Sequence, residues 1–231
     1  MKVPSQIYDL SQPVYSDCPQ YPDENPRPVS IRRMYMLAVQ GVNKEVVEIT
    51  THSGTHCDAP YHFFDDGATI DLIPLQRYVA PALVIDVRGK APGSAIEPRD
   101  IEPALQALSR GDVALLNTGW GARRENTATF LRDYVWLGGE AAAMLVHYGV
   151  AGVGIDAVSL GGYGDPAKAG PAHRAVLGSG AFVVEDLAFP DAVMDGRKRL
   201  FVAAPVKLRG CGGAWTRAML WEYDDRETLV S

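Results

Sequence analysis

The sequence predicts a mixed α/β fold, on two observations. Short apolar runs typical of buried strands alternate with helical patterns in the middle of the chain, and further strand-like segments gather at both ends. With 231 residues, of which 47% are hydrophobic, the chain is long enough to bury a sizeable core. We therefore expect one domain over residues 1–231, built on a mixed sheet rather than on a uniformly parallel one.

The N-terminal part is expected to contain a loop followed by two strands. Residues 18–30 hold four prolines and an aromatic residue, which indicates an irregular loop rather than a linker. Residues 30–39 and 44–52 are rich in β-branched and bulky side chains, so both segments are predicted to be strands.

The middle of the chain is predicted to alternate between strands and helices. Residues 80–89 and 111–119 are apolar runs of strand length, and the segment 97–110 between them has apolar residues at helical spacing. Residues 138–149 form a second predicted helix, which ends at a glycine. The remaining predictions are a strand at 150–159, a short helix at 171–180, and strands at 181–189, 200–208 and 214–223.

Composition excludes several classes of protein. The net charge of −6 and the pI of about 5.4, without a basic patch, argue against a nucleic-acid partner. No apolar run approaches the roughly 18 residues that cross a bilayer, and the N-terminus lacks the apolar core of a signal peptide, so a cytoplasmic location without membrane contact is expected. The three cysteines form no CxxC pair, which argues against a disulfide scaffold.

Histidines are concentrated in "THSGTHCDAPYHF", residues 51–63, which hold three of the five in the chain. Gly54 and the proline after "CDA" make a continuous helix improbable. In an extended segment His56 and Asp58 point to the same side and Cys57 to the other, while Gly54 lets the chain bring His52 towards them. Two imidazoles and a carboxylate that converge in this way suit Zn²⁺ or Mn²⁺.

The alternative to a metal is a hydrogen-bonded loop with structural histidines, but the H-x3-H-x-D-x3-H spacing makes chance a poor explanation. Further ligands must come from elsewhere. His147 lies on an apolar helix and is interpreted as a packed structural residue, whereas His173 lies near glycine-rich loops. Glu185 interrupts an apolar strand, and a buried carboxylate needs a partner such as a metal ion. Asp186 should face the opposite way.

These segments together resemble the cyclase-like metal hydrolases, a family that includes bacterial kynurenine formamidase and isatin hydrolase. The motif "HSGTHCDAPYHF" matches the family pattern H-x-G-T-H-x-D-x-P-x-H, and "GIDAVS" followed by "GPAHRAVLGSGAFVVEDL" provides a second match. The opening "YDLSQPV" and the "GWG" after "LLNT" also look like the family. The resemblance implies a swivelling β/β/α domain, assembled as a homodimer or homotetramer.

The resemblance also implies roles for individual residues. The metal ligands would be His52, His56, Asp58, His173 and Glu185, which would hold Zn²⁺ or Mn²⁺ as one ion or as a pair bridged by the aspartate. His62 would transfer protons. Tyr21, where formamidases have a tryptophan before a proline, and Trp120, in a "TGW" similar to isatin hydrolases, would contact substrate.

The expected function is a metal-dependent hydrolase that cleaves the C–N amide bond of a small aryl or cyclic amide. A metal-bound hydroxide would attack the carbonyl, and His62 would pass the proton to the leaving nitrogen. Three alternatives remain open: a dedicated kynurenine formamidase, a ring-closing cyclase, and a metal-binding protein without catalysis. Cys57 is a conceivable nucleophile, but its expected orientation argues against that role.

Overall fold

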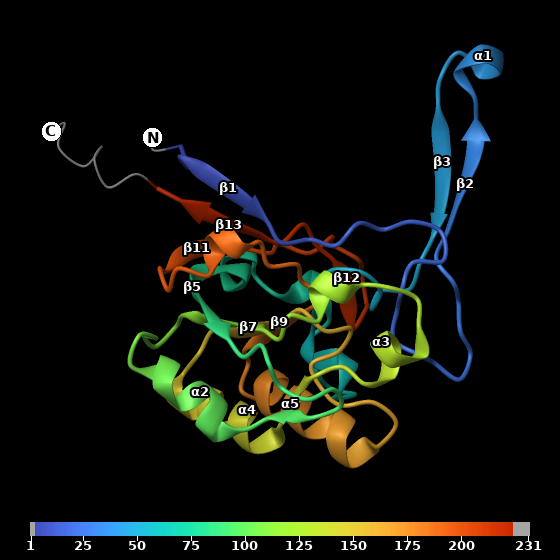
Figure 1. Ribbon diagram of the computed structural model, residues 1–231. Helices are drawn as coiled ribbons and strands as arrows, with labels where there is room; N and C mark the ends of the chain where they lie inside the picture. The colour runs from blue at the N-terminus through green and yellow to red at the C-terminus, as the bar shows by residue number, and fades with distance from the viewer. Residues whose placement is uncertain (1–2, 224–231) are drawn as a thin grey trace, which may run out of the picture.

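The computed structural model describes residues 3–223 and is built around a nine-stranded mixed sheet (Figure 1). The strand order is β1-β13-β11-β5-β7-β9-β10-β4-β12, in which the four neighbours β5, β7, β9 and β10 are parallel and every other pairing is antiparallel. The strands are β1 Gln6–Asp9, β4 His56–Asp58, β5 Val79–Asp86, β7 Val113–Asn117, β9 Gly152–Ile155, β10 Phe182–Glu185, β11 Arg199–Val202, β12 Gly213–Trp215 and β13 Met219–Glu222.

The helices that connect the parallel strands gather on one face of the sheet, and a further short helix lies at the tip of a projecting arm (Figure 1). Parallel neighbours need such crossovers, because a tight turn reverses the direction of the chain. The helices are α1 Leu37–Gln40, α2 Pro98–Leu105, α3 Ala128–Arg132, α4 Gly139–Tyr148 and α5 Pro166–Gly178, and a small sheet pairs β6 Ala95–Ile96 with β8 Trp136–Leu137. None of the helices within residues 3–223 has the length and apolar character needed to traverse a bilayer.

The central strands are buried on both faces. Along β7, Ala114 and Leu116 pack against the helices, whereas Val113 and Leu115 belong to a second core on the opposite face. Side chains alternate across a strand, so a strand that is covered on both sides must be apolar throughout. This explains why the middle strands are recognisable in the sequence as continuous apolar runs.

The sheet curls so that its two ends come near each other. β12 is the last strand in the sheet order and β13 is next to β1 at the other end, yet only residues 216–218 separate them in the chain. The four residue steps from Trp215 to Met219 span at most about 14 Å, so the two ends must be close. The mixed sheet and the β/β/α architecture are therefore confirmed, whereas the single strand predicted at 214–223 is wrong.

Other elements also differ from expectation, several of them because they end earlier than predicted: the helix predicted at 97–110 ends at Leu105, and the strands predicted at 44–52 and 200–208 end at Glu48 and Val202. The helix predicted at 171–180 begins earlier, at Pro166, because the Asp165 side chain accepts the N–H of Ala167 and caps it. The strand predicted at 30–39 ends at Tyr35, and the chain then turns through α1. His147 is exposed at the end of α4, so its interpretation as a packed residue is wrong.

A two-stranded arm projects from the body of the molecule (Figure 1). It consists of β2 Ser30–Tyr35 and β3 Lys44–Glu48, joined through α1 and paired antiparallel. We call residues 30–48 the arm. It forms no extensive contact with any other described helix or strand, and every residue of β3 is exposed. Both ends of the arm lead into segments that build the candidate site.

Candidate metal centre

Strand register gathers three of the predicted ligands on the helix face of the sheet. In the antiparallel pair of β4 and β10, His56 lies opposite Glu185 and Asp58 opposite Val183. Residues paired in this way share a face. Cys57 points to the other side, into the second core, where its thiol donates to the carbonyl of Ala203. The expected orientation of Cys57 is confirmed.

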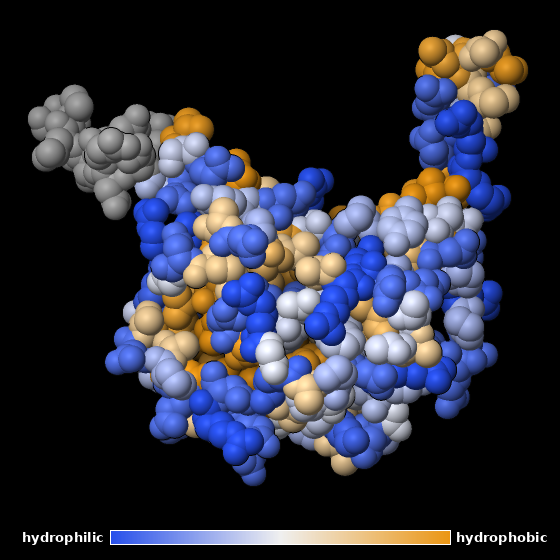
Figure 2. Space-filling model, in the orientation of Figure 1, coloured by the Kyte–Doolittle hydropathy of each residue, from blue (hydrophilic) through white to orange (hydrophobic). Residues whose placement is uncertain are grey.

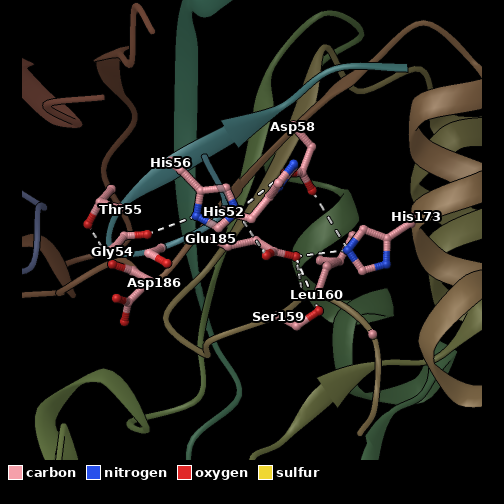
Figure 3. Close-up of polar contacts among 12 residues, drawn as sticks. His52, Gly54, Thr55, His56, Asp58, Ser159, Leu160, His173, Glu185 and Asp186 are labelled. Atoms are coloured by element: carbon pink, nitrogen blue, oxygen red, sulfur yellow. Dashed lines mark hydrogen bonds and ion pairs between the residues drawn. The ribbon is translucent and has the colours of Figure 1, made fainter. Parts of the chain in front are cut away.

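His173 reaches the same place from α5, the helix that covers this part of the sheet (Figure 3). Its Nε2 is 2.8 Å from Oε1 of Glu185 and 3.8 Å from Oδ2 of Asp58. The backbone N–H of Leu160 also donates to Glu185, at 2.6 Å. A helix and two strands therefore deliver the two carboxylates and two of the imidazoles.

His52 comes from the turn before β4 and bends back over the neighbouring strand β12. Its Nδ1 is 2.8 Å from Oδ1 of Asp58. Gly54, with φ 66°, lets the chain make this reversal. Gly213 provides the space, because a Cβ there would lie 2.6 Å from Cε1 of His52.

The ligand-type atoms form two groups that share one residue. His52, His56 and Asp58 make one group, and Asp58, His173 and Glu185 make the other, with all ligand atoms in a group within 4.8 Å of one another. All of them are buried except His52, which is partly exposed. Asp58 is central to both groups, as a carboxylate that bridges two ions would be.

The donor atoms fit a metal ion. Nδ1 of His56 lies 2.8 Å from the carbonyl of Gly54, and Nδ1 of His173 lies 2.8 Å from that of Ala169, so both Nδ1 atoms donate. In the neutral ring this leaves the lone pair on Nε2, which faces the carboxylates. Nε2 of His56 and Oδ2 of Asp58 are buried without a hydrogen-bond partner among the described residues. A cation between them would satisfy both atoms.

The electrostatics of the site call for positive charge. Burial alone would raise the pKa of Glu185, but the neighbouring histidines hold it at about 2, so the carboxylate is ionised. Burial would likewise lower the pKa of His56, yet Asp58 and Glu185 raise it well above its usual value. Two buried carboxylates are thus paired with imidazoles, and a divalent cation would replace the protons that otherwise balance them.

His62 stands apart from the ligand groups. It lies at the end of a short 3₁₀ turn, Pro60–His62, and its ring stacks on that of His52 with 3.9 Å between centroids. No hydrogen bond to its ring is formed by any residue in 3–223. Burial lowers its pKa to about 4, so the imidazole is neutral at pH 7. Its position beside the ligands and facing a cavity suits proton transfer better than coordination.

A cavity of about 710 Å³ opens over the site. His52, His62, His173 and Glu185 form its base, and one wall consists of residues 17–28. Tyr21 lines this wall, where its ring meets that of Tyr163 edge-on, with 5.8 Å between centroids. The cavity brings Tyr21, a predicted substrate contact, together with the predicted ligands.

Trp120, the other predicted substrate contact, lies elsewhere. Only 3% of its surface is exposed, and it is not among the residues that line the cavity. Its Nε1 donates to the carbonyl of Phe130, and its ring stacks over the Phe130 ring. The structure therefore gives Trp120 a packing role in the core.

Several residues of the site were not singled out from the sequence. Gln20 accepts from the hydroxyl of Ser53 at 2.7 Å and so ties the cavity wall to the turn that carries His52. Gly213 gives His52 its space, and the Gly212–Gly213 pair was the available signal, because glycine in a strand often marks a close approach. For Gln20, which belongs to a proline-rich loop, no pattern pointed to a role.

Comparison with known proteins supports the same assignment. Residues 8–161 match the family model described as "Putative cyclase", which is more than half of the chain. Among solved structures, a potential metal-dependent hydrolase with cyclase activity has a TM-score of 0.77 and 26% identity, over 95% of this chain and 98% of that one. A predicted metal-dependent hydrolase from Bacillus stearothermophilus has a TM-score of 0.76 and 26% identity, over 94% and 98%.

Isatin hydrolase A from Labrenzia aggregata, solved with benzyl benzoate, has a TM-score of 0.84 at 22% identity and covers 95% of this chain and 94% of its own. That likeness shows the fold. The family is shown by the sequence match instead. That match spans residues 8–161 and includes the strand and loop that carry His52, His56 and Asp58. The chain therefore belongs to the cyclase family.

Proposed function

We propose that the protein is a metal-dependent hydrolase that cleaves the C–N bond of a small aryl or cyclic amide. The observation that carries the proposal is the pair of ligand groups sharing Asp58 at the base of a cavity, with two buried polar atoms that have no hydrogen-bond partner within residues 3–223. Nitrogen and carboxylate ligands suit Zn²⁺ or Mn²⁺, as one ion or as a pair bridged by Asp58. Such an ion lowers the pKa of bound water and polarises a carbonyl.

The residues around the ligands supply the rest of the chemistry. His62, neutral at pH 7 and facing the cavity, takes the proton from the attacking water and returns it to the leaving nitrogen. Tyr21 and Phe63 line the cavity and provide flat apolar surface for an aryl or cyclic group. Phe63 stacks on His173 with 4.5 Å between centroids, which holds that surface against the ligands.

The residue His62 also separates this proposal from a metal-binding protein without catalysis. A binding site alone has no need of a further imidazole that stacks on a ligand and stays outside the ligand groups. Neither a dedicated formamidase nor a ring-closing cyclase is favoured by a particular contact. Both reactions therefore enter the test as competing outcomes.

The proposal is tested with purified protein, by elemental analysis and by turnover of a substrate panel. The panel holds an aryl formamide, N-formylkynurenine, a cyclic aryl amide and an unactivated alkyl amide. We expect Zn²⁺ or Mn²⁺ to co-purify, hydrolysis of an aryl or cyclic amide, and loss of that activity in a chelator with recovery on adding metal. Full activity in metal-free protein would overturn the proposal, and turnover of N-formylkynurenine alone would favour the formamidase.

We also propose that the protein forms a homodimer or homotetramer through the arm. A two-stranded hairpin on its own is marginally stable in water. The arm nevertheless exposes apolar side chains around its tip, visible as the orange end in Figure 2, and these include Met34, Met36, Leu37, Val39 and Val42. Its strands carry both cations and anions, such as Arg32 and Glu48, so the same surface of a second copy can complement it in a twofold arrangement.

A further inference from the structure

Arg124 connects two parts of the site that are far apart in sequence. The residue follows a short 3₁₀ turn, Gly121–Arg123, and only 6% of its side chain is exposed. Its Nη2 donates to Oδ2 of Asp186 at 2.8 Å, and its Nη1 donates to the carbonyl of Pro13 at 2.7 Å. A longer contact of 3.4 Å joins Nη2 to the carbonyl of Pro19.

Two of the three partners of Arg124, Asp186 and Pro19, lie beside functional elements. Asp186 directly follows Glu185, the ligand at the end of β10. Pro19 precedes Gln20 and Tyr21, which line the cavity. The guanidinium therefore connects a metal ligand with the cavity wall. Its partner Asp186 is one residue from Glu185, and its partner Pro19 is two residues from Tyr21.

Asp186 is held in an unusual conformation for this contact. Its φ of 54° lies in the left-handed region, which costs a non-glycine residue about 1 kcal/mol or more. Its N–H donates to the carbonyl of Ala157, and its own carbonyl accepts the hydroxyl of Thr55 at 2.6 Å. The backbone thus turns the Asp186 side chain away from Glu185 and towards Arg124.

We infer that Arg124 is a positioning residue, which fixes the cavity wall of residues 17–28 against the ligand strand and so sets the affinity for substrate. This inference rests on the proposed hydrolase function. Planar guanidinium groups suit the task, because several N–H donors point in fixed directions from one rigid group. A lysine could keep the contact with Asp186 but could not also hold both carbonyls.

The test compares Arg124→Met with a matched control, Arg199→Met. Arg199 is likewise a buried arginine, and it is held by two carboxylates, Asp195 and Glu222. It lies on β11, and none of these three residues lines the cavity. Kinetics use whichever amide of the panel the wild-type enzyme hydrolyses. For Arg124→Met we expect KM to rise about five- to fifty-fold, with kcat within roughly threefold and metal content unchanged.

Arg199→Met should lower the melting temperature similarly and leave KM unchanged. Arg124→Lys should give an intermediate KM. Equal KM changes in Arg124→Met and Arg199→Met, or no change in either, would overturn the inference. Failure of both Arg124 variants to fold would overturn it too, because Arg124 would then be a folding residue.

Hydrogen exchange provides a readout that does not depend on catalysis. Two backbone amides of the wall, those of Asp17 and Cys18, donate to the carbonyls of Val29 and Tyr15, and these hydrogen bonds should slow their exchange. They should exchange faster in Arg124→Met and at the wild-type rate in Arg199→Met. The two proposals fail on different results. If the wild-type protein hydrolyses no amide, the proposed function is wrong. If the wall amides exchange at the wild-type rate in Arg124→Met, the positioning role of Arg124 is wrong.

Discussion

The candidate metal centre and the arm adjoin each other in the chain but differ in which side chains they bury and expose. At the centre, charged side chains are buried, and the residue Asp58 has no exposed surface. In the arm, apolar side chains are in water, with 63% of Leu37 and 68% of Val39 exposed. Each region reverses the usual distribution of polar and apolar residues. In the function proposed above, a cation balances the buried charges and a second copy of the chain covers the exposed apolar side chains.

The largest effect is expected from removing a ligand. His56→Ala should lose metal and activity together, with turnover reduced by about 10³-fold or more, because Nε2 of His56 lies 3.3 Å from oxygens of both Asp58 and Glu185. Metal analysis and turnover are measured on the same sample. Cys57→Ala is the control from the same strand, and it should keep its metal and stay within about tenfold in rate, because Cys57 faces the opposite core.

The next largest effect belongs to His62. His62→Ala should keep its metal while turnover falls by roughly 10²- to 10⁴-fold, the usual scale for lost acid–base catalysis. The loss should be larger for an anilide than for an activated ester, which needs less protonation of its leaving group. A variant that loses its metal as His56→Ala does would make His62 a ligand. Full activity on the anilide would assign proton transfer to another group.

The arm should respond in the opposite way to the centre. Leu37→Asp combined with Val39→Asp places charges on the tip, where both side chains are exposed, so folding of the body should be unaffected. We expect the oligomer to dissociate, measured by sedimentation, with metal content unchanged. Lys44→Gln, a change on the exposed surface of β3, serves as the control. An unchanged oligomer, or a wild-type protein that is already monomeric, would contradict the proposal.

The smallest effect concerns acid stability at a site remote from both regions. Hydrogen bonds from Arg199 hold the pKa values of Asp195 and Glu222 below their usual range. A lowered folded-state pKa adds stability that is present above the unfolded value, about 4, and is lost as pH falls through the folded value. The melting temperature of wild type should therefore exceed that of Arg199→Met at pH 7, and the gap should shrink below about pH 4. A gap independent of pH would exclude this ionic contribution.

The sequence by itself determined the local chemistry of the protein. The spacing of His56 and Asp58 places both on one face of an extended segment, and the apolar runs identify the middle strands, because side-chain alternation and burial act over a few residues. The same local reasoning placed Cys57 on the opposite face. His173 and Glu185 were candidates from their sequence surroundings, and the family resemblance implied their role as ligands.

Tertiary structure decided what depends on distant segments. The curl of the sheet separates β12 from β13 within one apolar stretch, and only the packed fold shows that Gly213 makes room for His52. The burial of Trp120 against Phe130 and the contact of Arg124 with Asp186 likewise join residues whose spacing carries no signal. Long-range contacts are set by how whole elements pack, so local patterns point to candidate ligands but not to the surroundings that hold them.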